Sequence, residues 1–304
     1  MAGPGNLEHS TRRAADLTLT DINNRSQTRL GTESVEPTVS IVIPAKNEAL
    51  NLPHVFAGLE RDLYEVILVD GDSTDDTVEV ARRLWPEIIV IGQTRKGKGN
   101  ALACGFAEAT GDFIVMLDAD GSTDPAEIPR FVNALKEGAD FAKGSRFMAG
   151  AGAGSSDISR FRRVGNFFLN KIVNLLYGTS YTDLCYGYNA FRRECLSVMD
   201  LDAGVVDGID ECTMLWGDGF EVETLINVRI AKAGLEVAEV PSYERSRFFG
   251  DSNLHAVSDG IRVLRTIHAE RKRGARRAAS RSAATQREAG ISWSVISTLA
   301  QEAS

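Results

Sequence analysis

Short runs of β-branched and other apolar residues alternate with amphipathic stretches through the first half of the chain, and this alternation constrains the fold most. The apolar runs are residues 40–44, 65–69, 88–91, 113–117 and 141–143. Strands in regular alternation with helices predict a mostly parallel sheet, because the helices that connect parallel strands pack on both of its faces. We therefore expect an α/β fold that starts at Thr38.

The regular alternation ends after Gly144. The segment 148–156 is rich in Gly, Ala and Ser, which predicts a mobile loop. Beyond this loop we expect helices at residues 160–177, 220–233 and 259–271, and strands at residues 188–191 and 235–240.

Composition divides the chain into three parts. Residues 1–37 are polar and have no periodicity, which predicts a disordered N-terminal extension. Residues 38–258 hold the α/β pattern and form the expected main domain. Residues 259–304 predict an amphipathic helix followed by a basic C-terminal tail.

The C-terminal part combines an apolar helix face with a run of positive charge. Ile261, Leu264 and His268 share one face of the predicted helix, with Val263 and Ile267 adjoining it. Between residues 262 and 287, nine basic residues accompany one acid in a chain whose net charge is −8. Such an arm is typical either of a solvated tail or of a segment attracted to an anionic membrane surface. The acidic remainder argues against a nucleic-acid partner.

Composition also excludes several classes of protein. Apolar residues make up 43% of the chain, which excludes a collagen-like or wholly disordered protein. The four cysteines form no C-x-x-C pair, so neither a zinc ribbon nor a disulfide scaffold is indicated, and a cytoplasmic location is the simplest. No window reaches the ~20 uninterrupted apolar residues of a membrane-spanning helix, and residues 1–37 lack the apolar core of a signal peptide.

Acidic residues follow several of the predicted strands, and Asp118 and Asp120 are the most informative of them. Open α/β sheets bind ligands at the carboxyl ends of their strands. Two carboxylates separated by one small residue at such an end suit a hard cation, Mg²⁺ or Mn²⁺, with open positions for phosphate oxygens. The alternative is that both residues serve the turn and cap the helix that follows.

Two further segments have both a binding and a structural interpretation. Asp70 and Asp72 follow the second strand, where they would accept hydrogen bonds from a nucleobase or ribose, or cap the next helix. Lys98 belongs to a Lys-Gly-Lys-Gly run before a helix, which resembles a phosphate-binding loop without the Walker spacing. A flexible basic loop is the alternative for this run.

Taken together, these segments resemble the inverting family 2 glycosyltransferases, which have the GT-A nucleotide-sugar-binding fold. Four motifs in the family's order carry the resemblance: VSIVIPAKNE at 39–48, ILVDGDSTDDT at 67–77, GKGNA at 97–101 and FIVMLDAD at 113–120. Further segments resemble the dolichyl (polyprenyl) phosphate mannose synthase branch of the family: residues 143–147, 160–163, 183–188, 220–223 and 247–252. The resemblance covers about residues 38 to 265.

The resemblance implies roles for particular residues. It implies nucleotide contacts at Pro44, Glu48 and Val69, metal contacts at Asp118 and Asp120, and phosphate contacts at Arg146 and Arg247. From the same motifs we also place Ala45, Asn47, Asp70, Asp72, Lys98 and Ala119 in the donor site. The expected catalytic residues are Asp120, Arg146, Arg247 and Asp183.

Four departures from the family pattern affect these roles. Gly71 stands where a second Asp is usual, so recognition of the base falls to Asp72. Ser122 replaces a usual Gln, and Asn253 replaces an expected basic residue. The segment 200–218 is long and acidic, and we expect it to reshape the acceptor side.

The sequence therefore predicts a metal-dependent inverting transfer of mannose or glucose, from GDP-mannose or UDP-glucose, to a polyprenyl phosphate at the inner face of a membrane. A lipid phosphate is an anionic nucleophile at neutral pH, so the transfer needs charge neutralisation and positioning but no general base. The first alternative is a soluble hydroxyl acceptor, which would need a carboxylate base: Asp183, Asp210, Glu211 or Glu221. The remote alternative is an inactive module that binds a nucleotide sugar or a lipid.

Overall fold

The computed structural model describes residues 36–61, 64–149, 152–206, 213–250 and 260–273. Contacts divide the chain after Glu36, and the second unit, Pro37–Ser304, contains every element named below. The predicted extension at 1–37 and the predicted tail beyond residue 273 lie almost wholly outside the described residues.

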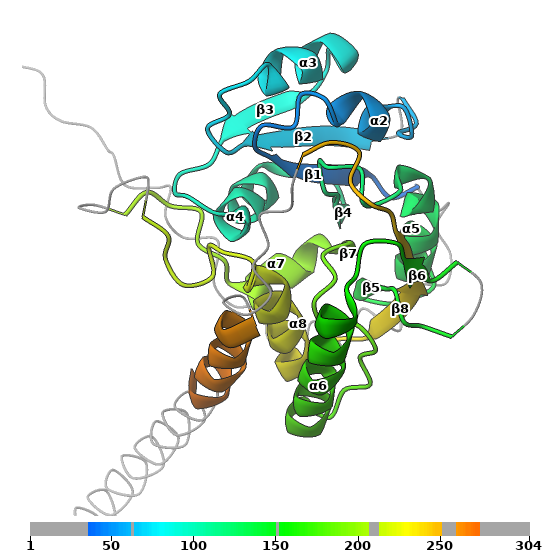
Figure 1. Ribbon diagram of the computed structural model, residues 1–304, viewed down its shortest axis with the longest axis vertical. Coiled ribbons are helices and arrows are strands. Elements are labelled where there is room, and N and C mark those ends of the chain that lie inside the picture. Colours follow the sequence, from blue (N-terminus) through cyan, green and yellow to red (C-terminus); the bar gives the residue numbers. More distant parts are fainter. Residues whose placement is uncertain (1–35, 62–63, 150–151, 207–212, 251–259, 274–304) are drawn as a thin grey trace, which may run out of the picture. The chain divides into compact units, whose positions relative to one another are not determined.

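A seven-stranded sheet forms the centre of this unit, with the strand order β3-β2-β1-β4-β7-β5-β8 (Figure 1). Its strands are β1 (Val39–Ala45), β2 (Tyr64–Asp70), β3 (Ile89–Gly92), β4 (Phe113–Met116), β5 (Phe141–Ser145), β7 (Asn189–Arg192) and β8 (Val237–Pro241). All neighbouring pairs are parallel except those of β7, which runs antiparallel to β4 and β5. The prediction of a mostly parallel α/β sheet is confirmed.

Helices cover both faces of the sheet (Figure 1). They are α2 (Leu52–Phe56), α3 (Thr77–Leu84), α4 (Lys98–Glu108), α5 (Ile128–Lys136), α6 (Arg160–Tyr177), α7 (Leu196–Met199), α8 (Val222–Ala233) and a helix over residues 260–273. Side chains alternate along β1, so Ile41 and Ile43 pack with α2, α3 and α5, whereas Val42 packs with α4 and α8. The two resulting cores hold the central strands between the helices.

A second, two-stranded sheet pairs β6 (Gly154–Ser155) with β9 (Tyr243–Glu244). The strand β6 lies inside the segment that the sequence predicted as a mobile loop. This pairing ties the chain before α6 to the chain after β8, and it brings Glu244 beside Ser155.

The helix over residues 260–273 packs through the residues that adjoin the apolar face noted in the sequence. Val263 and Ile267 are buried against α6 and α8, whereas Ile261 and Leu264 are about half exposed. Buried Glu270 pairs with Arg229 and Lys232 of α8 and so selects the face that docks. Within the described residues, no helix combines the length and apolar character needed to cross a membrane.

Candidate functional site

The carboxyl ends of β1, β2 and β4 border a cavity of about 890 Å³, which we call the donor cavity. Among the predicted site residues, those that line it are Pro44, Ala45, Asn47, Glu48, Lys98, Asp118, Ala119, Asp120 and Arg247. These residues come from the ends of β1 and β4, the start of α4 and the segment after β9. The topology therefore brings together residues that are up to about two hundred positions apart in the sequence.

The loop after β2 differs from its predicted role. Val69 is buried in the core, and neither Asp70 nor Asp72 lines the donor cavity. Asp70 accepts a hydrogen bond from the Ser73 backbone at 3.2 Å, and Asp72 has a left-handed φ of 63°. Gly71 lines the cavity in their place.

Asp118 and Asp120 lie at the end of β4 and line both the donor cavity and a second cavity. Asp120 Oδ1 accepts a hydrogen bond from the Ser122 backbone at 2.9 Å, while Asp124 caps the 3₁₀ turn that follows. The residue that caps the following turn is therefore Asp124, and neither Asp118 nor Asp120 has this role. Two carboxylates at an open strand end fit a hard divalent cation. In the described parts of the chain, no group of three or more His, Cys, Asp or Glu side chains lies close enough to hold a metal ion.

Lys98 holds a central position between two carboxylates. Its ammonium Nζ lies 2.7 Å from Asp118 Oδ1 and 3.0 Å from Glu223 Oε1. Burial alone would lower the pKa of Lys98, but the two carboxylates outweigh burial and raise it above its ordinary value. Burial raises the pKa of Glu223, which Lys98 partly opposes.

Glu48 and Arg247 form a second ion pair at the rim of the donor cavity. Arg247 Nη2 donates to Glu48 Oε1 at 2.8 Å, and Asn51 donates to the other oxygen of Glu48. Burial, assisted by the nearby negative charge of Asp120, raises the pKa of Glu48, while Asn51 and Arg247 limit the rise. Arg247 lines both cavities and is therefore placed where two ligands would meet.

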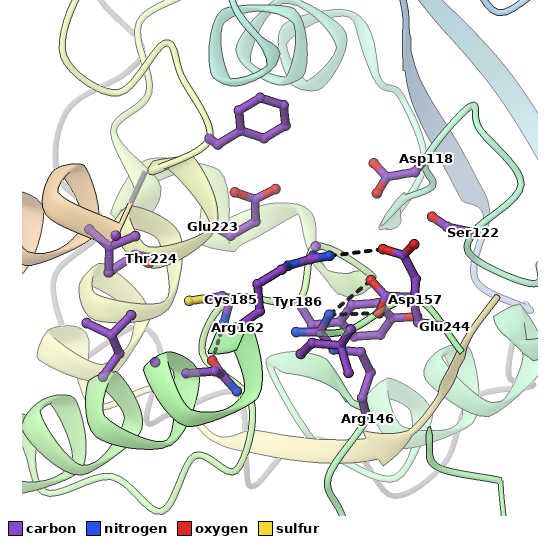
Figure 2. A pocket seen from close by; sticks show the side chains of 18 of the residues that line it. Asp118, Ser122, Arg146, Asp157, Arg162, Cys185, Tyr186, Glu223, Thr224 and Glu244 are labelled. Carbon is purple, nitrogen blue, oxygen red and sulfur yellow. Dashed lines mark hydrogen bonds and ion pairs between the residues drawn. The ribbon is translucent and has the colours of Figure 1, made fainter. Parts of the chain in front are cut away.

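The second cavity, of about 220 Å³, lies beside α6, and we call it the acceptor cavity. It shares Lys98, Asp118, Asp120, Phe220 and Arg247 with the donor cavity. Figure 2 shows Asp118 and Ser122 on one side of it and Cys185, Glu223 and Thr224 on the other. Arg162 of α6 reaches into this view and pairs with Asp157 at 3.0 Å.

Arg146 forms a buried ion network in the wall of the acceptor cavity. Its Nε and Nη2 donate to Asp183 at 2.7 and 2.9 Å, and its Nη1 donates to both oxygens of Glu244. Each guanidinium nitrogen thus already donates a hydrogen bond to a carboxylate. We therefore assign Arg146 mainly a structural role in the wall of the acceptor cavity. Its predicted contact with a phosphate stays a prediction.

Asp183 is completely buried and also accepts hydrogen bonds from Asn166 and from the Arg146 backbone. It is therefore better placed to position Arg146 than to act as a base. Of the other bases considered for a hydroxyl acceptor, Glu221 is buried and accepts from the Gly217 backbone, and it lines neither cavity. Asp210 and Glu211 lie outside the described residues.

In the described part of the segment 200–218, Met214 borders the donor side; the prediction that the segment reshapes the acceptor side stays a prediction, since residues 207–212 lie outside the described residues. Arg95 donates to both carboxylate oxygens of Asp218, and the Gly99 backbone donates to the Asp218 carbonyl at 2.7 Å. A Cβ atom at Gly99 would overlap the carbonyl of Gly217.

Sequence reasoning assigned no role to Glu223, Glu244 or Arg162. Glu223 lies in the segment 220–223, whose resemblance to the family branch is the sequence signal that could have found it; in the structure it is an acid in the buried run of α8, Val222–Ile230. Arg162 lies in the segment 160–163, which carried the resemblance without a role for the single residue. Glu244 gave no comparable signal, because its partner Arg146 lies far away in the sequence.

This chain is similar to known glycosyltransferases. The family model of Glycosyl transferase family 2 matches residues 40–199. The glycosyltransferase AglJ of Haloferax volcanii is 32% identical over 229 residues, covering 73% of this chain and 68% of that protein. The dolichol-phosphate mannosyltransferase of Pyrococcus furiosus is 33% identical over 232 residues, covering 71% of this chain but only 59% of that protein. An uncharacterized glycosyltransferase of Mycobacterium tuberculosis is 34% identical, with 71% and 89% covered.

Solved structures share the fold at lower identity. Glucosyl-3-phosphoglycerate synthase of Mycobacterium tuberculosis has a TM-score of 0.56 and 23% identity, over 77% of this chain and 80% of that chain. A complex of the same enzyme with Mn²⁺, UDP and glucosyl-3-phosphoglycerate has a TM-score of 0.54 and 22% identity, over 77% and 79% of the two chains.

Proposed function

Because the chain belongs to glycosyl transferase family 2, we propose that it transfers a hexose from a nucleotide sugar to the phosphate of a polyprenyl phosphate. The observation that carries this proposal is the meeting of two cavities at Asp118, Asp120 and Arg247. A donor in one cavity and an acceptor in the other would place the reacting groups next to each other. As a glycosyltransferase of the GT-A fold, the chain is an enzyme, and we set the inactive-module alternative aside.

On the donor side, Asp118 and Asp120 would hold Mg²⁺ or Mn²⁺. When bound, the cation supplies positive charge that stabilises the departing nucleoside diphosphate. Lys98 and Arg247 add the chain's own positive charge to the same place. Tyr186, Ser122 and Phe220 shape the acceptor side of this junction.

On the acceptor side, the arginines Arg162 and Arg247 line the cavity and provide charge for a phosphate group. A phosphate oxygen attacks the face of the anomeric carbon opposite the leaving group, which inverts its configuration. Since the phosphate is already ionised, this reaction does not require a base in the cavity. The proposal of a lipid phosphate is also supported by the dolichol-phosphate mannosyltransferase name of the relative from Pyrococcus furiosus.

The helix α6 supports a location at a membrane surface. Its outer side exposes large apolar side chains, the most exposed being Phe161, Val164, Phe167, Phe168 and Leu175. The helix also carries Arg160, Arg163 and Lys171 at exposed positions and has no acidic residue. A basic helix with an apolar face is typical of segments that lie on anionic membranes. The inner side of α6 lines the acceptor cavity, so such contact would bring a lipid acceptor to the site.

The second candidate function is transfer to a soluble hydroxyl acceptor. Glu223 favours it, because this carboxylate lines the acceptor cavity and burial raises its pKa, as a general base requires. The pairing of Glu223 with Lys98 opposes this role, since an ion-paired carboxylate is a weaker base.

One assay separates the two candidates. The full chain is incubated with Mn²⁺ or Mg²⁺ and with GDP-mannose or UDP-glucose, with and without a polyprenyl phosphate, and release of nucleoside diphosphate is measured. We expect release that depends on both the cation and the lipid phosphate. Efficient glycosylation of a water-soluble alcohol in the absence of lipid would favour the second candidate and contradict the first.

A further inference from the structure

The ion pair between Lys98 and Asp118 lies at the junction of the two cavities. Lys98 and Asp118 line both of them, while Glu223 lines the acceptor cavity alone. The Lys98 ammonium lies 2.7 Å from Asp118 and 3.0 Å from Glu223. This single positive charge therefore contacts both carboxylates at the junction.

Three separate elements hold this bridge. Lys98 begins α4, Asp118 follows β4, and Glu223 lies in the first turn of α8. Gly187 packs beside it, because a Cβ atom there would lie 3.1 Å from both Lys98 Nζ and Glu223 Oε1. The bridge is therefore a built feature of the fold and not a chance contact of an exposed lysine.

Lys98 contacts the carboxylate of Asp118, one of the two groups that would hold a divalent cation. Two cations close to one carboxylate repel each other, and one must move before the other binds well. A donor diphosphate in the adjoining cavity offers the ammonium a new anionic partner. Binding of the diphosphate would then free Asp118, and binding of the cation would favour the diphosphate.

We propose that Lys98 is a resident counter-cation of Asp118, which makes binding of the divalent cation depend on binding of the nucleoside diphosphate. The proposal rests on the proposed function, since it takes the donor to be a nucleotide sugar used with Mg²⁺ or Mn²⁺. Glu223 is a positioning residue in this arrangement. It holds part of the ammonium charge, which weakens the hold of Lys98 on Asp118.

The test measures Mn²⁺ binding to the full chain by electron paramagnetic resonance of free Mn²⁺, with and without UDP or GDP. For the wild-type protein we expect weak binding alone and strong enhancement by a nucleoside diphosphate. Lys98→Met should tighten Mn²⁺ binding without nucleotide by at least about fivefold, the low end of ordinary coupling between two sites. The same variant should lose most of the enhancement by nucleotide.

Lys272→Met is the control for the loss of one lysine charge, because Lys272 is exposed and lines neither cavity. Within the described residues it is not paired with Asp118 or Glu223, so the variant should bind Mn²⁺ without nucleotide as the wild type does. Lys98→Arg keeps the charge and should keep weak binding. Glu223→Gln should weaken Mn²⁺ binding, and this effect should shrink in the Lys98→Met background.

Two results would overturn the inference in distinguishable ways. If the wild type shows nucleotide-dependent Mn²⁺ binding but Lys98→Met binds Mn²⁺ no better without nucleotide, the counter-cation role is wrong and the proposed function stands. If the wild type binds no Mn²⁺ even with UDP or GDP, the metal requirement of the proposed function fails and the inference fails with it. If Lys98→Met does not fold, Glu223→Gln decides: unchanged or tighter Mn²⁺ binding contradicts the proposal.

Discussion

Charged residues of the site divide into those that face a ligand space and those that hold its walls. Asp118, Asp120 and Arg247 line both cavities. Arg146 and Asp183 are buried in an ion network, and removing one partner of such a network leaves an uncompensated buried charge. Substitutions in the first group should therefore affect catalysis, and substitutions in the second should first affect folding.

Asp120→Ala tests the first group. We expect kcat to fall by at least ~10²-fold, because the variant removes a group that serves developing charge at the donor phosphates. Thermal unfolding should change little, since Asp120 belongs to the site and not to a core cluster. Asp124→Ala is the control from the same loop: loss of its cap should cost ~1 kcal/mol of stability while activity is retained. Near-normal activity of Asp120→Ala would contradict the metal assignment.

Arg247→Ala tests the arginine that lines both cavities. A phosphate contact that strengthens in the transition state is worth about 3 kcal/mol, so we expect kcat to fall by ~10²-fold. Arg245→Ala is the matched control, because Arg245 lies two residues earlier and pairs with Asp124 at the surface. Equal, small losses in steady-state kinetics of both variants would show that Arg247 is only a surface charge.

The positions of the acidic residues after β4 were predictable, whereas those after β2 and the long-range ion pairs were not. Asp118 and Asp120 follow an apolar strand directly, so their place at the sheet edge follows from the strand itself. The partners of Lys98 and Arg146 depend on how separate elements pack, which no local pattern records. For the same reason Asp183 was expected as a base, although its environment makes it a partner of Arg146.

Among the elements, the helix over residues 260–273 depends most on a single charge. Burial favours a raised pKa of Glu270, but Lys232 and Arg229 outweigh burial and lower it. A carboxylate whose pKa is lower in the folded than in the unfolded state stabilises the fold at neutral pH, and this stabilisation is lost as the pH falls through the folded pKa.

Glu270→Gln should therefore lower the free energy of unfolding at pH 7 by about 3 kcal/mol. The difference from the wild type should shrink as the pH falls below about 4, where the unfolded carboxylate is protonated. Urea denaturation at several pH values measures both effects. Arg271→Gln changes the next, exposed residue and should leave stability almost unchanged. A pH-independent effect of Glu270→Gln would contradict the role of its charge.

The order of the main strands and helices was predictable as far as β8, with α6, β7, α8 and β8 close to the expected residues, but the docking face of the last helix was not. Alternating apolar runs separate the strands clearly, and the structure has them at nearly the expected residues. In the last helix, Ile261 and Leu264 compete with Val263 and Ile267 for the buried side. The pairing of Glu270 with α8 decides between them, and that pairing is a tertiary contact.

At the scale of the whole molecule, the exposed side of α6 predicts attachment to anionic vesicles. We expect the full chain to sediment with phosphatidylserine-containing vesicles at low salt and to be released at high salt. Phe168→Glu combined with Leu175→Glu should reduce sedimentation strongly without loss of stability, since both side chains are exposed. Val205→Glu, at an exposed apolar residue outside α6, is the control.

A chain truncated after residue 273 keeps the docked helix. Comparing its vesicle binding with that of the full chain measures how much residues 274–304 contribute to binding. A cut after Leu264 would instead remove Ile267 and Glu270 and disturb the packing against α8. If the α6 variant and the wild type sediment alike, the membrane contact lies elsewhere in the chain.

The close approach of Gly99 to the carbonyl of Gly217 has a consequence for protein engineering. Any side chain at Gly99 would displace the backbone of the neighbouring segment, so the two stretches have to change together. A chimera that exchanges only residues 213–218 with a relative would place a foreign backbone against an unmatched loop. Exchanging residues 95–100 and 213–218 as one cassette would preserve the fit, so such a cassette is the natural unit of exchange in this part of the fold.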